Sequence, residues 1–310
     1  MAPTADATSS PAFAPQTGTP VEVAPGIVRV TAPNASAFTF TGTNSFLLGT
    51  HRLLVIDPGP KDRRHLEALL GAIGGRPVEA ILLTHTHRDH SDLARELRKQ
   101  TGAPLRFSHP HRLFRQATWL ERRWLGRACD FALTPDAPIA DGEVIEGDGV
   151  SLIALATPGH CENHLCFGVR GTALLFSGDH VMGWSSTVVA PPDGAMGPYL
   201  ASLEKTIMAP FSRYLPAHGD LIAEGRKAAR ALLAHRQSRN AEILDGLDHG
   251  ADSPKKLVDR VYRNISPKLR PAAYATLGAH LDYLIETGAI TRKASATGRR
   301  YERVRPHEAA

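Results

Sequence analysis

Three histidines and an aspartate fall within six residues of this chain, directly after a predicted apolar strand at residues 78–84. Side chains alternate along an extended chain, so His85 and His87 point the same way and can hold one metal ion. Asp89 and His90 come after the strand bends, where they can reach a second ion. The alternative is a histidine tract on the surface, which the position at a strand end disfavours.

Three more residues of metal-ligating type follow other apolar strands. Any one of them alone would more often be an ordinary hydrogen-bonded side chain, but four strand ends that converge on such residues are poorly explained by coincidence. Imidazole and carboxylate donors suit two zinc ions, with iron or manganese as substitutes. The residues, each with its preceding strand, are His160 after 152–156, Asp179 after 173–177 and His218 after 213–215.

Apolar, β-branched runs and helical periodicity recur after residue 20, which predicts an α/β fold of stacked sheets covered by helices. The remaining strands are predicted at 26–30, 45–48 and 53–56, and the helices at 63–73, 92–100, 200–208 and 225–244.

Composition narrows the class of protein. No stretch approaches the roughly 20 uninterrupted apolar residues of a membrane span, so we expect no membrane association. The three cysteines contain no C-x-x-C pair and are too few for a disulfide framework. Residues 1–20 carry a single charge and no apolar signal region, and are predicted to be a disordered tail. We therefore expect a reduced, cytoplasmic protein.

The basic character of the chain belongs to its last part, since residues 250–310 hold twelve basic and six acidic side chains. This part resembles a winged helix, with helices from Ser253 to Arg263 and over 270–287, and a hairpin over 289–304. Such modules often place the second helix in a nucleic-acid groove. The alternative is a module that packs on the body or builds a dimer. The sequence leaves both open, and with them the oligomeric state.

Residues 105–130 depart from the α/β rhythm and contain six arginines and four aromatic residues. The preferred interpretation is a helical insertion whose aromatic side chains dock on the body while its arginines face water. The alternative is a lid, or a strip that stacks an anionic substrate.

The order of these motifs resembles the metallo-β-lactamase-fold hydrolases over residues 20–240. This resemblance implies an αββα sandwich in which His85, His87 and His160 hold the first metal and Asp89, His90 and His218 the second. Asp179 would bridge both, as in the glyoxalase II type of site, and Asp57 would orient a ligand histidine. The alternative for Asp57 is a plain turn-former before Pro58 and Gly59. His164 is predicted to support or pack, and His109, His111 and His180 to be surface or structural residues.

The C-terminal part is similar to that of the β-lactamase-like protein 2 group. The predicted domains are thus a tail at 1–20, a catalytic domain at 21–240 and a winged-helix-like domain at 241–310. The resemblance implies a hydrolase whose metal-bound hydroxide attacks the substrate, with Asp89 steering that nucleophile or passing a proton.

The substrate is the part that the sequence leaves open. Cleavage of single-stranded RNA is preferred, thioester or ester hydrolysis is the alternative, and β-lactam hydrolysis comes third. A nucleic-acid-binding regulator without activity would have damaged ligands, and a metal-stabilised scaffold would have no open pocket.

Overall fold

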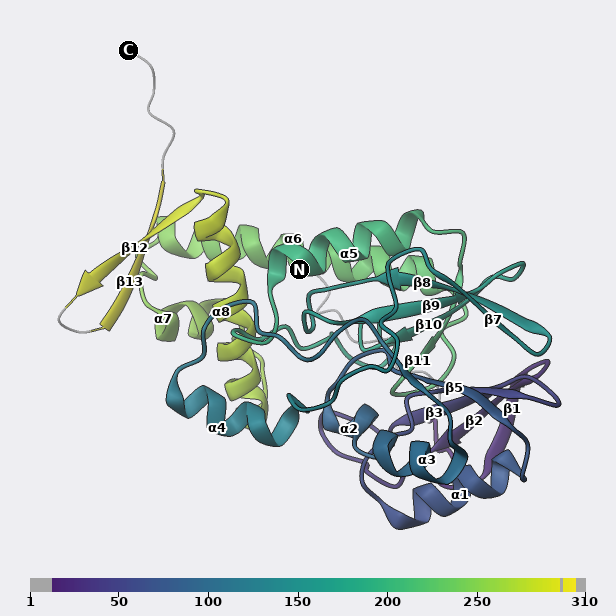
Figure 1. Cartoon of the computed structure of the whole chain (residues 1–310). Coiled ribbons are helices and arrows are strands. Elements are labelled where there is room, and N and C mark those ends of the chain that lie inside the picture. The colour runs from purple at the N-terminus through teal and green to yellow at the C-terminus, as the bar shows by residue number, and fades with distance from the viewer. Residues whose placement is uncertain (1–12, 296–297, 305–310) are drawn as a thin grey trace.

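The computed structural model describes residues 13–295 and 298–304, and two β-sheets packed face to face form its centre (Figure 1). Apolar side chains from both sheets, among them Leu54, Phe167 and Phe176, fill the space between them. Helices α1 (Arg63–Ile73) and α3 (Ala94–Thr101) cover the outer face of the first sheet. Helices α5 (Met196–Met208) and α6 (Gly225–Asp248) cover the second. The layers are those of the predicted αββα sandwich.

The first sheet has six strands in sequence order. They are β1 (Pro20–Ala24), β2 (Ile27–Thr31), β3 (Asn44–Leu48), β4 (Leu53–Ile56), β5 (Val78–Leu82) and β6 (Leu105–Arg106). The first four pair antiparallel, and β4, β5 and β6 pair parallel. Parallel neighbours end at the same edge, which brings Asp57 after β4 beside the histidine segment after β5.

The second sheet has five strands in the order β11-β10-β9-β8-β7. They are β7 (Val144–Gly147), β8 (Val150–Ala156), β9 (Leu165–Val169), β10 (Leu174–Gly178) and β11 (Arg213–Pro216). Strands β10 and β11 are parallel and joined through α5, so Asp179 and His218 leave the sheet at one edge.

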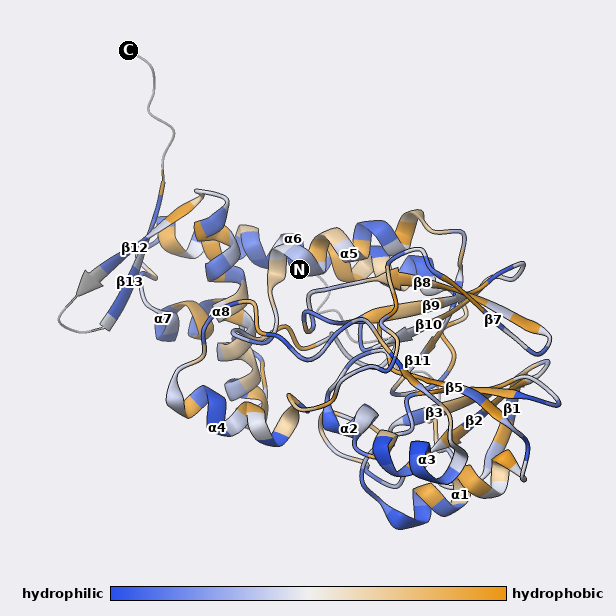
Figure 2. Cartoon of the chain, in the orientation of Figure 1, coloured by the Kyte–Doolittle hydropathy of each residue, from blue (hydrophilic) through white to orange (hydrophobic). Residues whose placement is uncertain are grey.

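Figure 2 shows hydrophobic residues concentrated along the strands of the two central sheets, whereas α3 is largely hydrophilic. Among the helices of the described residues, none combines the length and apolar character that a bilayer crossing requires.

The C-terminal module is the predicted winged helix. It contains α7 (Pro254–Val261), a short 3-10 turn η1 (Pro267–Leu269), α8 (Arg270–Glu286) and the hairpin β12 (Ile290–Ser295) and β13 (Gly298–Arg303). Ser253 caps α7 by accepting a hydrogen bond from the Lys256 N–H, as the Ser-Pro pair predicts. The module has its own apolar core around Leu257, Leu277 and Ile290.

The predicted limits of the parts differ in detail from the structure. Residues 1–12 of the predicted tail lie outside the described residues. The rest of the predicted tail, residues 13–20, contacts the first sheet. The Arg29 guanidinium lies over the Phe13 ring, and Pro20 pairs with Val30. At the other limit, α6 continues through residue 240 without a break.

The interpretation of the insertion is partly wrong. Helix α4 (Trp119–Ala128) forms there, and Phe107 packs in the core as expected. However, Trp119 and Trp124 are 69% and 63% exposed. Helix α4 lies at the rim of the fold, between α8 and α2 (Arg88–Ser91) (Figure 1). It therefore buries only Leu125.

Candidate metal centre

The structure brings the seven predicted ligands together at the shared edge of the two sheets. Nδ1 of His87 lies 3.0 Å from Nε2 of His85 and 3.0 Å from Nε2 of His160. Three nitrogens of different imidazoles thus converge on one point, and they can hold a cation. The turn that carries His160 needs a glycine, since Gly159 has φ 144° and its backbone lies against Tyr199.

A second group of donors lies beside the first. Oδ2 of Asp89 lies 3.5 Å from Nε2 of His90 and 3.4 Å from Nε2 of His218. These three side chains can hold a second cation.

Asp179 stands between the two groups. Its Oδ1 is 3.3 Å from Nε2 of His218 and 3.6 Å from Nε2 of His90, and its Oδ2 is 3.5 Å from Nε2 of His160. One carboxylate therefore addresses both groups, the arrangement expected of a bridging ligand.

The hydrogen bonding of these atoms fits a pair of metal ions. Nε2 of His90, Nε2 of His218 and Oδ1 of Asp179 are buried, and no described residue gives them a hydrogen-bond partner. Buried polar atoms are nearly always paired, so three such atoms facing one another suit the binding of cations. The residues present thus suit the metals that the donor types predict.

The outer nitrogen of each histidine is held by the protein. Nδ1 of His160 donates to the Val188 carbonyl over 2.7 Å, and Nδ1 of His218 lies 3.3 Å from the Gly42 carbonyl. Such contacts fix the tautomer and leave the opposite nitrogen free to bind a metal.

Asp57 supports two of the histidines. It accepts hydrogen bonds from the Thr84 N–H, the Thr84 hydroxyl and Nδ1 of His90. The Thr84 hydroxyl proton is thereby committed to Asp57, so Nδ1 of His85 donates to the Thr84 oxygen over 3.0 Å. Asp57 has φ 50°, a conformation in which the chain turns sharply after β4.

Protein charges alone shift several pKa values in this cluster. Burial opposes protonation of His218, but Asp179 and Asp89 outweigh it and raise the pKa of His218 to about 9. Burial favours a neutral Asp179, yet His218 and His90 hold its pKa well below the ordinary value. Since a ligating imidazole must be unprotonated, a cation at this position would compete with the proton on His218.

Two further residues support the centre: Asp193, which is not among the residues predicted from the sequence, and His111, which is predicted to be a surface or structural residue. Nε2 of His87 lies 2.7 Å from Oδ2 of Asp193, and Nε2 of His111 lies 2.7 Å from its Oδ1. Asp193 stands in a Pro-Pro-Asp-Gly segment that reads only as a turn, so no local signal marks it. His111 is buried beside the centre. His164 accepts a hydrogen bond from the Asp179 N–H, in agreement with a supporting role.

A cavity of about 430 Å³ opens over the centre. Four of the predicted ligands line it, namely His87, Asp89, His160 and Asp179. Its walls are mainly apolar, formed by Phe38, Pro60, Trp124, Met182, Val188 and Ala190, with Arg88 and Arg127 among the polar residues. A larger cavity of about 620 Å³ between the insertion, α5 and α8 contains none of the seven residues.

Comparison with known proteins agrees with this geometry. Residues 38–218 match the metallo-beta-lactamase superfamily and residues 253–299 the beta-lactamase associated winged helix domain. An atrochrysone carboxyl ACP thioesterase of Paecilomyces divaricatus is 29% identical over 73% of this chain and 66% of its own. A beta-lactamase-like protein 2 homolog of Drosophila melanogaster is 28% identical over 87% of this chain and 91% of its own.

A solved structure extends the likeness over both parts of the chain. A metallo-beta-lactamase family protein from Thermus thermophilus superposes with a TM-score of 0.73 at 27% identity, covering 91% of this chain and all of that one. The chain therefore belongs to the metallo-β-lactamase superfamily of metal-dependent hydrolases and carries the winged-helix domain associated with it.

Proposed function

We propose that this protein hydrolyses thioesters or esters that carry an apolar acyl group. The observation that carries the proposal is the cavity over the metal centre, whose lining surface is mainly apolar although polar residues also contribute to it. A volume of about 430 Å³ suits a small molecule. An acyl chain would lie along the wall of Trp124 and Met182, with its carbonyl facing the site where the seven side chains would hold the metals.

Seven side chains would hold the metals: His85, His87 and His160 on one side, Asp89, His90 and His218 on the other, and Asp179 between them. Two bound cations, with zinc the first expectation, supply Lewis acidity and lower the pKa of water. The apolar part of the cavity wall would hold the acyl group and so orient the substrate carbonyl.

Asp89 is placed to handle a proton. It lines the cavity with its side chain 30% exposed, and only its Oδ2 approaches His90 and His218. Burial raises the pKa of Asp89, but the facing His90 and His218 outweigh it and hold that pKa well below the ordinary value. An ionised Asp89 can accept a hydrogen bond from the nucleophile at its free Oδ1 and so steer it, and its low pKa means that any proton it takes up passes readily to the leaving group.

A named activity among the relatives supports this substrate class. The Paecilomyces divaricatus relative is described as a thioesterase acting on an acyl group attached to a carrier protein. Arg127, exposed on the cavity wall, would meet an anionic part of such a substrate.

Cleavage of single-stranded RNA is the second candidate. The exposed Trp119 and Trp124 share α4 with Arg122, Arg123 and Arg127, a combination that suits stacked bases and phosphates. The basic composition of the winged helix supports RNA binding less than it first suggests, because three of its basic side chains form ion pairs with acidic residues. The pairs are Lys293 with Glu302, Arg300 with Asp252 and Arg303 with Asp248.

One assay panel tests the choice. Metal-loaded protein is incubated separately with a medium-chain acyl thioester, the matching short-chain thioester and labelled single-stranded RNA, with Asp179→Ala as the control. We expect turnover of the thioesters, faster for the longer chain, and none by the variant. RNA cleavage without thioester turnover would overturn the proposal in favour of the nuclease.

A further inference from the structure

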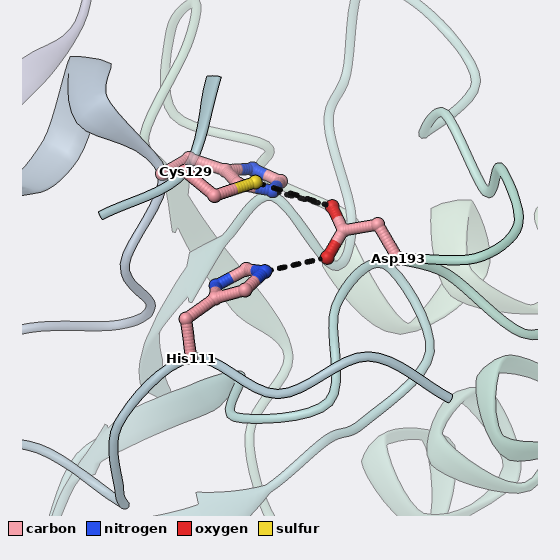
Figure 3. A group of neighbouring side chains, drawn as sticks. His111, Cys129 and Asp193 are labelled. Atoms are coloured by element: carbon pink, nitrogen blue, oxygen red, sulfur yellow. Dashed lines mark hydrogen bonds and ion pairs between the residues drawn. The ribbon is translucent and has the colours of Figure 1, made fainter. Parts of the chain in front are cut away.

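A buried cluster of His111, Cys129 and Asp193 lies beside His87, outside the seven predicted ligands. Figure 3 shows the side chains of His111 and Cys129 directed at the two carboxylate oxygens of Asp193. Nε2 of His111 lies 2.7 Å from Oδ1, and Sγ of Cys129 lies 3.9 Å from Oδ2. The cluster joins three distant segments: the loop after β6, the end of α4 and the loop before α5.

Two interpretations fit these residue types. Histidine, cysteine and carboxylate are ligands of zinc, so the cluster can be read as a third metal site with His87 as a shared ligand. Alternatively, it is a hydrogen-bonded support that orients His87 toward the main centre.

A comparison of the hydrogen bonds in the main centre with those in this cluster decides between the two interpretations. The main centre leaves Nε2 of His90, Nε2 of His218 and Oδ1 of Asp179 buried without partners among the described residues. In the cluster, by contrast, Asp193 accepts a hydrogen bond from His111 on Oδ1 and one from His87 on Oδ2. Nδ1 of His111 lies 2.8 Å from the Thr86 hydroxyl. The cluster is already satisfied by protein atoms and needs no cation.

The direction of these bonds follows from the chemistry of the groups. An ionised carboxylate only accepts, so both imidazoles donate their Nε2–H to Asp193. The Thr86 hydroxyl, which contacts Nδ1 of His111, is fixed as well, because the Asn163 side chain donates to it and to the His109 carbonyl. His111 is thus held at both nitrogens, and it holds Asp193 in turn.

His87 has a special need for such an acceptor. It faces His85 and His160 with Nδ1, whereas those two histidines present Nε2. A neutral imidazole can bind through Nδ1 only when its proton is on Nε2. The position of the Asp193 carboxylate at Nε2 enforces that tautomer.

We propose that Asp193, clamped by His111, is a positioning residue that fixes the ring and tautomer of His87 so that Nδ1 is presented to the metal centre. This inference rests on the dinuclear centre of the proposed function. It does not depend on which bond the enzyme breaks.

The test is metal binding without substrate, using Asp193→Asn, His111→Gln and Asp148→Asn. Asn keeps the shape of Asp193 but presents an NH₂ to one of the two donors. Asp148 is a remote control that accepts hydrogen bonds from a surface turn and does not line the cavity. Each full-length protein is titrated with Co²⁺, which reports ligand geometry through its visible absorption, and zinc affinity is measured by chelator competition.

We expect the wild type and Asp148→Asn to bind two equivalents with the same spectrum. Asp193→Asn should bind one equivalent about 10- to 100-fold more weakly, with an altered cobalt spectrum. His111→Gln should weaken the binding of the same equivalent by a smaller factor. This second variant keeps the test decisive if Asp193→Asn does not fold.

Three outcomes would contradict the inference or its basis, and they can be told apart. Unchanged affinity and spectrum in both Asp193→Asn and His111→Gln would overturn the positioning role alone. A third tight equivalent that disappears in Cys129→Ala would show that the cluster is itself a metal site. A wild type that binds no metal would instead overturn the proposed function.

Discussion

Asp57 accepts a hydrogen bond from Nδ1 of His90 over 3.0 Å, although the two residues are 33 positions apart in the chain. Both are buried, and the bond crosses from the residue that follows β4 to helix α2. Asp57, expected from the resemblance to orient a ligand histidine, therefore lies directly behind the predicted metal ligand His90.

Replacing Asp57 by Asn should weaken both metal binding and the fold. Asp57 accepts three hydrogen bonds on its two oxygens, whereas Asn would present an NH₂ in place of one oxygen and face at least one of these donors with another donor. We therefore expect zinc affinity to fall about 10- to 100-fold. We expect the free energy of unfolding to fall by about 1–3 kcal/mol. Asp62→Ala is the matched control, because Asp62 is another aspartate in the same loop between β4 and α1. It removes the N-cap of α1 and should cost about 1 kcal/mol without changing zinc affinity.

Replacing Asp179 by Ala should remove the carboxylate that both donor groups share. We expect the metal content, measured by mass spectrometry of the desalted protein, to fall below two ions per chain. Hydrolysis should fall at least about a hundredfold, since the supply of reactive water depends on both cations. A variant that keeps two ions and full turnover would show that Asp179 is not a bridging ligand.

Trp124→Ala should alter substrate use without altering stability. The indole is 63% exposed on the cavity wall, so its loss creates no core cavity but removes apolar surface from the substrate path. We expect kcat/KM for a medium-chain thioester to fall about tenfold. Trp119→Ala is the control, because Trp119 is 69% exposed on the same helix and does not line the cavity. Equal losses in both variants would contradict the assignment of the cavity.

Acid should destabilise the protein through buried neutral histidines. Burial, followed by the charges of Arg236 and neighbouring groups, lowers the pKa of His280 to about 3. The unfolded chain titrates near 6.5, so it binds more protons than the folded chain between pH 6.5 and 3. Stability is thus lost as the pH falls through this window.

The measurement is urea unfolding at about pH 7 and about pH 4.5, compared between wild type and His280→Gln. We expect the variant to be less stable at neutral pH, because His280 bonds Asn240. Its loss of stability on acidification should be smaller by about 1 kcal/mol or more. An identical pH dependence in the two proteins would show that His280 does not titrate in this way.

The sequence predicts those parts of this structure whose determinants are local. Helix α1 is predicted at its observed bounds from its periodicity, and the structure shows local caps at both ends, Asp62 at its start and Gly74, with φ 59°, at its end. The histidine segment is equally local, since one strand end carries four of the seven site residues. Strands β1, β6, β7 and β9 are not predicted, because pairing with neighbouring strands stabilises them more than their own patterns do.

What the sequence does not predict depends on distant partners. Asp193 meets His87 across 106 positions, and nothing near Asp193 indicates that contact. The exposure of Trp119 and Trp124 likewise follows from where α4 comes to lie, because periodicity alone cannot distinguish a helix on the core from one at a rim.

Helix α6 contributes Ala229 to the core of the catalytic body and Ile243 to the core of the winged helix. Its 24 residues span about 36 Å as one rod, without a flexible joint between the two cores. The winged helix is therefore carried at a set distance and angle from the catalytic cavity. A truncation made anywhere along α6 would strip apolar cover from at least one core, so the chain cannot be divided there into two self-sufficient pieces.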